Sequence, residues 1–339
     1  MPKSAYEQAG VSIDRGNQAV ERIKSMVKKM GVQEIGKFGG FFPLKGNLRH
    51  PILVSSADGV GTKLKLAFLM GVHDTVGRDL VNHCVNDILV YGAKPLFFLD
   101  YLASGRVEPK VVGEVVSGVL DGCLENETVL LGGETAEMPG FYRDGEYDIA
   151  GFIVGIVGKA NVVDGKAIRR GDLLVGLPSS GLHTNGYSLA RHIVFEKLHL
   201  KVSSKVSELE LSVGEELLRV HRSYLKPVRP LLEQGLLKGM AHITGGGLLE
   251  NVPRILPEAV SVAIEKTWPV PPLFQFLVQA GSVSEAERYR VFNMGIGMVL
   301  VIDPKKLSRV EAALEKAGEE HFLIGQVTEN RGRERVRIG

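Results

Sequence analysis

The sequence predicts an α/β protein of two domains, and three observations support this fold class. Short apolar runs typical of buried strands alternate with amphipathic helical stretches along the whole chain. The 339 residues are enough for two domains of ordinary size. A polar, charged segment over residues 161–171 separates two halves that share the order of strand, glycine-rich turn and helix. We therefore expect an N-terminal domain over residues 1–170 and a C-terminal domain over residues 171–339.

The composition excludes several classes of protein. With 41 basic and 39 acidic side chains the net charge is +2, so no strong field favours nucleic acid or a membrane surface. The chain has no signal-peptide pattern and no apolar run long enough to span a bilayer. Cys84 and Cys123 stand among apolar neighbours, which predicts buried free thiols in a reducing compartment. We expect a cytoplasmic protein that binds neither nucleic acid nor membrane.

Residues 55–63 are the most informative part of the first half. They follow an apolar run over residues 51–54 that predicts a strand, and they precede a stretch of helical composition over residues 64–70. A strand, a glycine-rich turn and a helix N-terminus together form an anion site. Asp58 opens this turn and Lys63 closes it. A carboxylate can hold Mg²⁺ while an ammonium neutralises phosphate oxygens, although a surface turn with solvated charges is the alternative.

The next helix, which begins near residue 79 and ends at Gly92 and Pro95, carries a second acidic face. This face is rich in oxygen ligands and comprises Asp79, Asn82, His83, Asn86 and Asp87. Asp87 alone fits a solvated surface carboxylate. Asp58 and Asp87 taken together favour metal binding.

Strands are also predicted over residues 95–102, 128–131 and 149–157, with helices over residues 18–30 and 109–126. A second glycine-rich turn follows the strand at 128–131 and contains Gly132, Gly133 and Glu134. This composition indicates further Mg²⁺ or nucleotide contacts. Residues 31–37 match G-x-x-x-x-G-K, but Phe38 replaces the required hydroxyl and a helix precedes the match, so we do not expect a Walker A loop.

In the second half, strands are predicted over residues 173–177, 260–264, 297–302 and 322–327, with a helix over residues 305–317. The loop over residues 178–186 contains His183, which is either a ligand contact or a loop residue satisfied by backbone. Gly245, Gly246 and Gly247 form a turn that can receive a phosphate at a helix N-terminus. Residues 331–337 predict an edge strand with solvated arginines.

Long motifs of the chain resemble the phosphoribosylformylglycinamidine cyclo-ligases, also called aminoimidazole ribonucleotide synthetases. The matching segments cover nearly the whole chain and are residues 9–14, 58–63, 86–102, 132–140, 181–188, 242–247 and 290–298. The resemblance implies a homodimer in which the N-terminal domains of two subunits contribute strands to a β-barrel at the dimer interface. Each C-terminal domain is then expected to be a sheet covered by helices.

The resemblance also implies the reaction. ATP phosphorylates the formyl oxygen of formylglycinamidine ribonucleotide, and the amidine nitrogen attacks the activated carbon. The products are 5-aminoimidazole ribonucleotide, ADP and phosphate. Such chemistry requires ATP and Mg²⁺, with the protein supplying position and charge neutralisation.

Roles for individual residues follow from the resemblance. Asp58 and Asp87 are expected to hold Mg²⁺, with Glu134 as a third candidate, and Lys63 to contact the transferring phosphate. His183 and His242 are candidates for proton transfer, and no general base is assigned. The expected nucleotide and substrate contacts are Asp14, Gly59, Gly61, Thr62, Asn86, Gly132, Gly133, Glu134, Thr135, Asn185, Gly245, Gly246 and Gly247. The polar segment over residues 6–17 is expected to close over ATP.

Two other readings remain open. One is a small-molecule kinase of the same superfamily, such as thiamine monophosphate kinase or selenophosphate synthetase. The chain has no cysteine near its N-terminus, which argues against the latter. The other is a regulator that binds nucleotide without turning it over, against which the acidic residues beside the glycine-rich turns argue.

Overall fold

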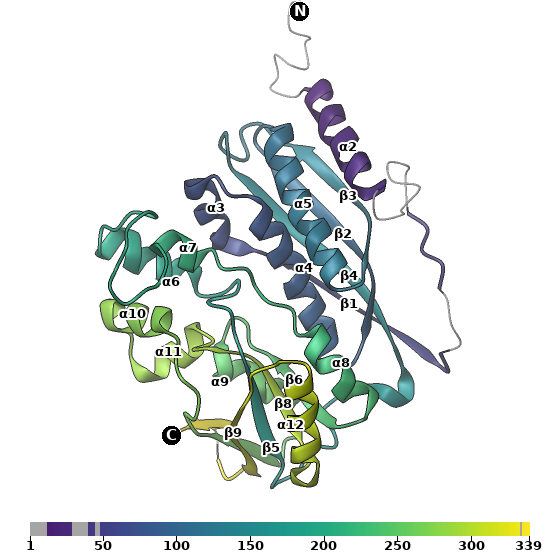
Figure 1. Ribbon diagram of the computed structural model, residues 1–339, viewed down its shortest axis with the longest axis vertical. Coiled ribbons are helices and arrows are strands. Elements are labelled where there is room, and N and C mark those ends of the chain that lie inside the picture. The colour runs from purple at the N-terminus through teal and green to yellow at the C-terminus, as the bar shows by residue number, and fades with distance from the viewer. Residues whose placement is uncertain (1–11, 29–39, 45–47, 333) are drawn as a thin grey trace, which may run out of the picture.

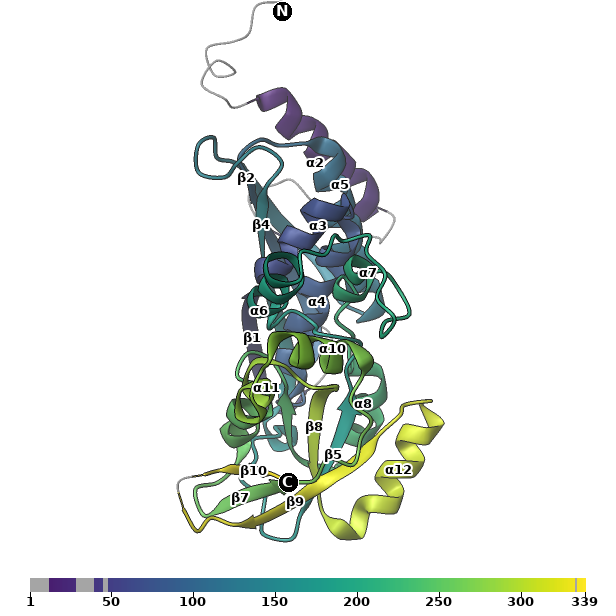
Figure 2. The ribbon, with the colours of Figure 1, turned by 90° about the vertical axis from the view of Figure 1, so that its left-hand side faces the viewer.

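The computed structural model describes residues 12–28, 40–44, 48–332 and 334–339. Two β-sheets lie toward opposite ends of an elongated molecule, and helices pack around and between them (Figure 1, Figure 2). The predicted α/β architecture with two sheets is therefore confirmed. The G-x-x-x-x-G-K match and residues 6–11 of the segment over residues 6–17 lie outside the described residues.

The first sheet has four strands in the order β1-β4-β2-β3. The strands are β1 (Pro51–Gly59), β2 (Lys94–Ser104), β3 (Val129–Glu137) and β4 (Tyr147–Gly158). The helices of this half are α2 (Ile13–Lys28), α3 (Leu64–Met70), α4 (Asp74–Leu89) and α5 (Pro109–Glu125). Strand β4 is antiparallel to both β1 and β2, whereas β2 and β3 are parallel. Helices α4 and α5 cover one face of this sheet, and α2 packs on α5.

Two predicted turns are strands in the structure. Strand β1 continues through Asp58 to Gly59, so only residues 60–63 turn into α3. Strand β3 runs through Gly132 and Gly133 to Glu137. The glycine at position 133 has a packing reason, because a Cβ there would collide with the side chain of Asp100 on β2.

The second sheet has six strands in the order β10-β7-β9-β5-β8-β6. The strands are β5 (Leu173–Pro178), β6 (Leu237–His242), β7 (Val260–Ile264), β8 (Ile296–Ile302), β9 (Phe322–Glu329) and β10 (Val336–Ile338). The helices are α6 (Tyr187–Arg191), α7 (Val213–Leu217), α8 (Leu225–Glu233), α9 (Gly247–Asn251), α10 (Pro272–Gly281), α11 (Glu285–Val291) and α12 (Leu307–Lys316). The neighbouring strands are antiparallel except β10 and β7. The predicted edge strand over residues 331–337 is confirmed only at its end, as β10, and Arg335 is not solvated but donates to the carbonyl oxygens of Leu256, Pro257 and Val260.

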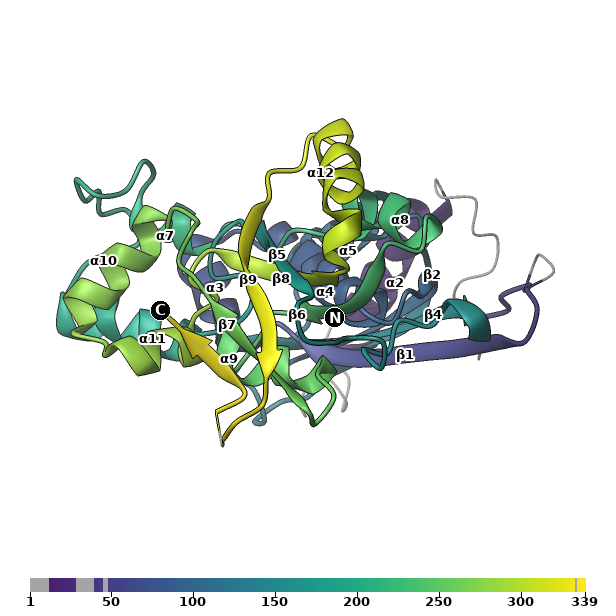
Figure 3. The same ribbon diagram turned by 90° about the horizontal axis from the view of Figure 1, so that it is seen from below.

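Helices cover both faces of the second sheet. Strand β8 is buried along its whole length, and its side chains alternate between two hydrophobic clusters. Met298, Leu300 and Ile302 pack with residues of α8 and α12, whereas Val299 and Val301 pack with residues of α9 and α10. Seen from below, α8 and α12 lie together on one side of the strands (Figure 3).

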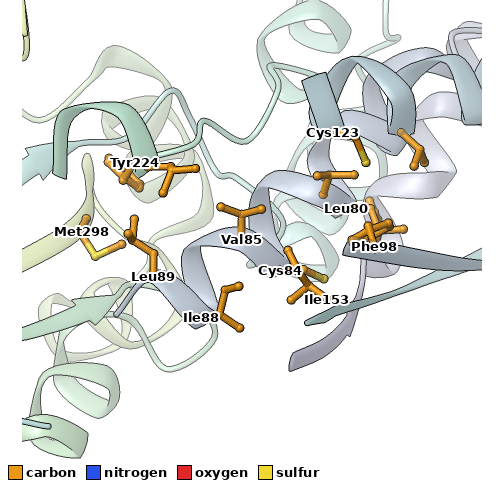
Figure 4. Close-up of a cluster of buried hydrophobic side chains, with 14 of the residues drawn as sticks. Leu80, Cys84, Val85, Ile88, Leu89, Phe98, Cys123, Ile153, Tyr224 and Met298 are labelled. Atoms are coloured by element: carbon orange, nitrogen blue, oxygen red, sulfur yellow. The ribbon is translucent and has the colours of Figure 1, made fainter. Parts of the chain in front are cut away.

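Helix α4 packs against both halves of the chain. Its residue Leu80 lies near Phe98 of the first sheet, whereas Leu89 lies near Tyr224 and Met298 of the second half (Figure 4). Burying apolar surface at both ends of one helix favours a fixed position of the two halves.

Cys84 and Cys123 are buried free thiols, as predicted. None of the helices in the described ranges is long and apolar enough to cross a membrane.

Candidate active site

The two acidic residues predicted to bind a metal lie close together where the two halves of the chain meet. Asp58 stands near the end of β1 and Asp87 in the last turn of α4. Both approach the same ring nitrogen: His83 Nε2 is 2.7 Å from Asp58 Oδ2 and 3.9 Å from Asp87 Oδ2. The second half contributes His242, the last residue of β6, whose Nδ1 is 2.8 Å from Asp87 Oδ1.

Both carboxyl groups are ionised at neutral pH. Burial raises the pKa of Asp58, but the hydrogen bond from His83, the charge of that ring and the hydrogen bond from Gly59 N together bring the pKa below the ordinary value. Burial also raises the pKa of Asp87, and the hydrogen bonds and charges of the groups around it, His242 first, together bring its pKa below the ordinary value. Ser56 stabilises the ionised form further, because its hydroxyl donates to Asp87 Oδ2 at 2.9 Å.

These oxygen donors fit Mg²⁺. Two ionised carboxylates within reach of one another are the ligands that a small hard cation prefers. Three buried histidines, His183, His221 and His242, also offer nitrogens within 4.8 Å of one another. However, the rings of His183 and His221 are stacked with centroids 4.0 Å apart and an interplanar angle of 15°. A metal lies in the plane of the imidazole that binds it, so one ion cannot be ligated by both rings.

A chain of hydrogen bonds joins the two carboxylates through four buried side chains, which are His83, Thr184, His221 and His242. His83 Nδ1 is 2.6 Å from the Thr184 hydroxyl, which is 3.3 Å from His221 Nδ1. His221 Nε2 is in turn 3.1 Å from His242 Nε2. Because one of these two nitrogens must donate and the other accept, the position of each proton in the chain depends on the others.

Sequence reasoning did not find His221 or Thr184 as site residues. His83 had a signal, because it precedes Asp87 by four residues and therefore shares its helical face. His221 stands in a segment without a recognisable pattern, and burial lowers its pKa well below the ordinary value, which keeps the ring neutral.

The position of Lys63 differs from the prediction. Its side chain is completely buried, and Nζ lies 2.7 Å from Asp79 Oδ2. The ammonium also donates to the carbonyl oxygens of Arg219 at 2.7 Å and His183 at 3.2 Å. An ammonium has three N–H donors, and all three have partners here, so none remains for a phosphate. Lys63 instead connects the turn after β1 to two loops of the second half.

Asn86 also has a structural position. Its side-chain amide donates to Arg222 O at 2.9 Å, and its Oδ1 accepts from Tyr224 N at 3.0 Å. The side chain is fully buried. The predicted nucleotide contact at Asn86 is therefore not met in this structure, and Asn86 instead holds the segment before α8 against α4.

Glu134 is separated from the other two predicted metal ligands within one chain. Asp58 of β1 pairs with Gly151 of β4. Gly151 also pairs with Asp100 of β2, and Asp100 in turn pairs with Gly133 of β3. Neighbouring strands are ~4.8 Å apart and successive side chains alternate between faces. Glu134 therefore lies three strands away from Asp58 and on the other face. The other predicted contacts on this strand are likewise distant: Gly132, Gly133 and Thr135.

The turn before α9 does come near the site. Asn185 lies beside Gly245, because a Cβ at Gly245 would be 3.2 Å from Asn185 Oδ1. Gly246 and Gly247 have φ angles of +93° and +56°, and a Cβ at Gly247 would also collide with the carbonyl oxygen of Tyr289. The last two glycines are thus required by the backbone, whether or not the turn binds phosphate.

The remaining predicted nucleotide and substrate contacts lie in different parts of the structure. Gly59 ends β1, and Gly61 with φ of +62° begins the turn into α3. Thr62 lies against the second half, with its hydroxyl 3.3 Å from that of Ser188. Asp14 is exposed in the first turn of α2, which packs on the far side of α5 and is remote from Asp58 (Figure 1).

A cleft of about 470 Å³ opens between the two halves beside these residues. Asp87 and His242 lie in its wall, whereas His183 is not among its lining residues. From the first half and the connecting segment it is lined by Ser55, Ser56, Asp87, Val90, Tyr91, Val163 and Asp164, and from the second half by Met240, Ala241, His242, Thr244, Asn251, Arg254 and Ile255. A volume of this size suits a small-molecule ligand.

Comparison with known proteins gives consistent results. The model of the AIR synthase related protein N-terminal domain matches residues 48–157, and that of the C-terminal domain matches residues 169–337. The phosphoribosylformylglycinamidine cyclo-ligase of Syntrophotalea carbinolica is 53% identical over 334 residues, which cover 97% of this chain and 95% of that protein. The enzyme of the same name from Geobacillus thermodenitrificans is 51% identical over 97% of this chain and 96% of its own.

Solved structures share the fold at low sequence identity. Thiamine-monophosphate kinase from Stenotrophomonas maltophilia has a TM-score of 0.65 at 16% identity, with 95% of each chain covered. PurL from T. maritima, complexed with AMPPCP, has a TM-score of 0.56 at 16% identity and covers 95% of this chain and 48% of its own. At such identities the similarity extends to the fold alone.

Proposed function

The chain belongs to the phosphoribosylformylglycinamidine cyclo-ligase family, and we propose that its reaction takes place at the Asp87 end of the interdomain cleft. As a member it is an ATP-dependent ligase of purine biosynthesis. It converts formylglycinamidine ribonucleotide to 5-aminoimidazole ribonucleotide, ADP and phosphate. The observation that supports this location is the approach of two ionised carboxylates, from β1 and α4, to His83, with Asp87 also lining a cleft of suitable volume.

The chemistry explains why such a site is needed. An amide oxygen is a poor leaving group, and transfer of the γ-phosphoryl group of ATP to the formyl oxygen makes it a good one. The amidine nitrogen then forms the new C–N bond, and the oxygen departs on phosphate. Because ATP supplies the activation, the protein must mainly orient the reactants and neutralise phosphate charge.

We assign charge neutralisation to Mg²⁺ held by Asp58 and Asp87, which would bridge the protein to the nucleotide phosphates. Glu134 remains a candidate ligand or nucleotide contact only from a second subunit, since the strand register separates it from Asp58 within one chain. Lys63 acts here as a positioning residue, because its three donors hold Asp79 and two loop carbonyls of the second half.

We assign proton transfer to His242 in preference to His183. Ring closure releases a proton from the attacking nitrogen, and an acceptor must reach the cleft. His242 lines the cleft and its Nδ1 is held by Asp87. His183 is buried behind it, where its Nε2 accepts from Ser180 N at 3.2 Å. Because Nδ1 is held by Asp87, accepting the proton at Nε2 requires the contact between His242 and His221 to open.

We further propose the homodimer. One face of the first sheet carries apolar side chains that are open to solvent in a single chain: Phe152 is 45% exposed and Leu53 is 60% exposed. These two residues belong to the face opposite α4 and α5, and Phe42 covers only its Phe97 region. A second copy would bury this surface and bring strands of two subunits into the interface barrel.

The proposed domain boundary at residue 171 falls between the two sheets.

The rival functions differ in what releases ADP. A cyclo-ligase releases ADP only when formylglycinamidine ribonucleotide is present. A thiamine monophosphate kinase releases ADP with its own substrate, and a regulator releases no ADP with either substrate. The test is a coupled ADP assay of the purified protein with ATP and Mg²⁺ and each substrate in turn. ADP release that ignores formylglycinamidine ribonucleotide would overturn the proposal.

A further inference from the structure

The interdomain cleft is lined by a carboxylate–histidine pair and by one arginine. Asp87 and His242 lie at the carboxyl terminus of β6. Arg254, in the segment after α9, lines the same cleft. Its guanidinium contacts Asn251 Oδ1, which also accepts from the hydroxyl of Thr244 at 3.2 Å, so the guanidinium lies beside the turn that follows β6.

Arg254 is the cationic side chain among the lining residues of this cleft. Its Nη1 donates to Asn251 Oδ1 at 3.1 Å. Among the ion pairs of the described residues, none involves Arg254. A guanidinium has five N–H donors in a planar fork, so most of them remain for a ligand in the cleft.

The support behind Arg254 is rigid. Asn251 is almost completely buried, and its amide donates to the carbonyl oxygens of Gly247 at 2.8 Å, Gly245 at 3.2 Å and Thr244 at 3.3 Å. With its amide nitrogen fixed in this way, its Oδ1 is directed to Arg254. A guanidinium held by one hydrogen bond loses less side-chain freedom when it binds a ligand.

The acidic lining does not cancel this charge. Asp164 also lines the cleft, but its carboxylate accepts from Lys166 Nζ at 2.6 Å and from Lys166 N at 3.1 Å. Asp87 is engaged by His242 and Ser56. The Arg254 guanidinium is therefore suited to bind an anion.

We propose that Arg254 binds the phosphate monoester of the ribonucleotide substrate, so that the formamide at the other end of that molecule reaches Asp87 and His242. This inference rests on the proposed function. The substrate carries its phosphate on one side of the ribose and its reacting group on the other. Arg254 and the Asp87–His242 pair line one cleft, so each can meet one of these groups. ATP fits this orientation less well, because its phosphates must meet the metal ligands Asp58 and Asp87. A planar guanidinium can bind two oxygens of a phosphate at once.

Steady-state kinetics of Arg254→Gln test the proposal. Loss of a charge-assisted phosphate contact is expected to lower kcat/KM for formylglycinamidine ribonucleotide by about 10- to 100-fold, while KM for ATP stays within about twofold. Arg254→Lys keeps the charge and should recover part of the loss. Arg229→Gln, which changes an exposed arginine paired with Glu127, is the matched control and should leave both constants unchanged.

The dephosphorylated substrate, formylglycinamidine riboside, supplies the second readout. The wild-type protein should prefer the ribonucleotide to the riboside, and Arg254→Gln should reduce this preference by the same factor as its loss in kcat/KM. An unchanged preference, or a loss confined to KM for ATP, would overturn the inference. Wild-type protein that is inactive on the ribonucleotide would instead overturn the proposed function, so the two failures are distinguishable.

Discussion

At the scale of single residues, the role of Lys63 is decided by burial. Its motif position suggested a phosphate contact, yet the side chain lies in the interior between Asp79 and two backbone carbonyls. Burial lowers the pKa of Lys63 against the opposing effect of Asp79, and it raises the pKa of Asp79. The local sequence could not reveal this, because the partners of Lys63 are in distant segments.

Removal of one partner of a buried ion pair leaves an uncompensated charge. We therefore expect Lys63→Met to lower the free energy of unfolding by about 3–5 kcal/mol, because Asp79 stays buried without its cation. Urea unfolding followed by circular dichroism measures this change. The double variant Lys63→Met, Asp79→Leu should regain much of the loss. If Lys63→Met instead keeps full stability and loses only turnover, the phosphate contact predicted from the motif is correct.

Asp58 and Asp87 stay predicted metal ligands. Each acid stands in a motif whose composition points to a ligand, and both approach His83 in the structure. We expect Asp58→Asn and Asp87→Asn each to lower kcat by about 100-fold or more, the scale of a preorganised electrostatic contact. Steady-state kinetics at saturating ATP and Mg²⁺ measure this loss, and the unfolding midpoint should change little. The control is Asp121→Asn on the exposed side of α5, which should keep normal turnover. Normal turnover in either site variant would exclude metal binding from its role.

At the scale of elements, apolar runs located most strands, but β6 was not predicted and the pair Gly132–Gly133 was misread as a turn. Glycine at position 133 stands inside β3 because the side chain of Asp100 occupies the space of its Cβ. Burial raises the pKa of Asp100 to about 7. The need for glycine at position 133 comes from a neighbouring strand. The local sequence over residues 129–137 therefore could not distinguish a strand from a phosphate-binding turn.

The glycines before α9 allow a matched test of backbone requirement. Gly247 has φ of +56° and a Cβ there would meet Tyr289 O, whereas Gly318 has φ of +68° with open space around it. We expect Gly318→Ala to cost about 1 kcal/mol of stability from strain alone. Gly247→Ala should cost about 1–3 kcal/mol more because it adds a steric collision. Thermal unfolding of both variants decides this, and equal losses would show that the turn can relax.

At the scale of the whole molecule, the apolar face of the first sheet is the main unpartnered feature. Phe152 and Leu53 give it a hydrophobic surface that a single chain leaves open. The family resemblance predicted a dimer there, and sequence patterning could not, because β4 carries apolar side chains on both faces. The two-sheet architecture itself was predictable from the alternation of strands and helices on either side of residues 161–171.

We expect Phe152→Asp to dissociate the dimer, because a buried carboxylate at an apolar interface is strongly unfavourable. Sedimentation velocity at micromolar concentration should show the wild-type protein with the mass of two chains and the variant with the mass of one. Leu124→Asp, a similar change at an exposed position of α5, is the control and should remain dimeric. A wild-type monomer would contradict the proposed assembly.

We propose that the formyl oxygen is activated by phosphorylation beside Asp58 and Asp87. The most direct test uses formylglycinamidine ribonucleotide labelled with ¹⁸O in the formyl group, with ATP, Mg²⁺ and the purified protein. Mass spectrometry of the released phosphate should find one ¹⁸O atom for each ring that closes. If the label appears in water and the phosphate stays unlabelled, the oxygen did not leave on phosphate and the account is contradicted.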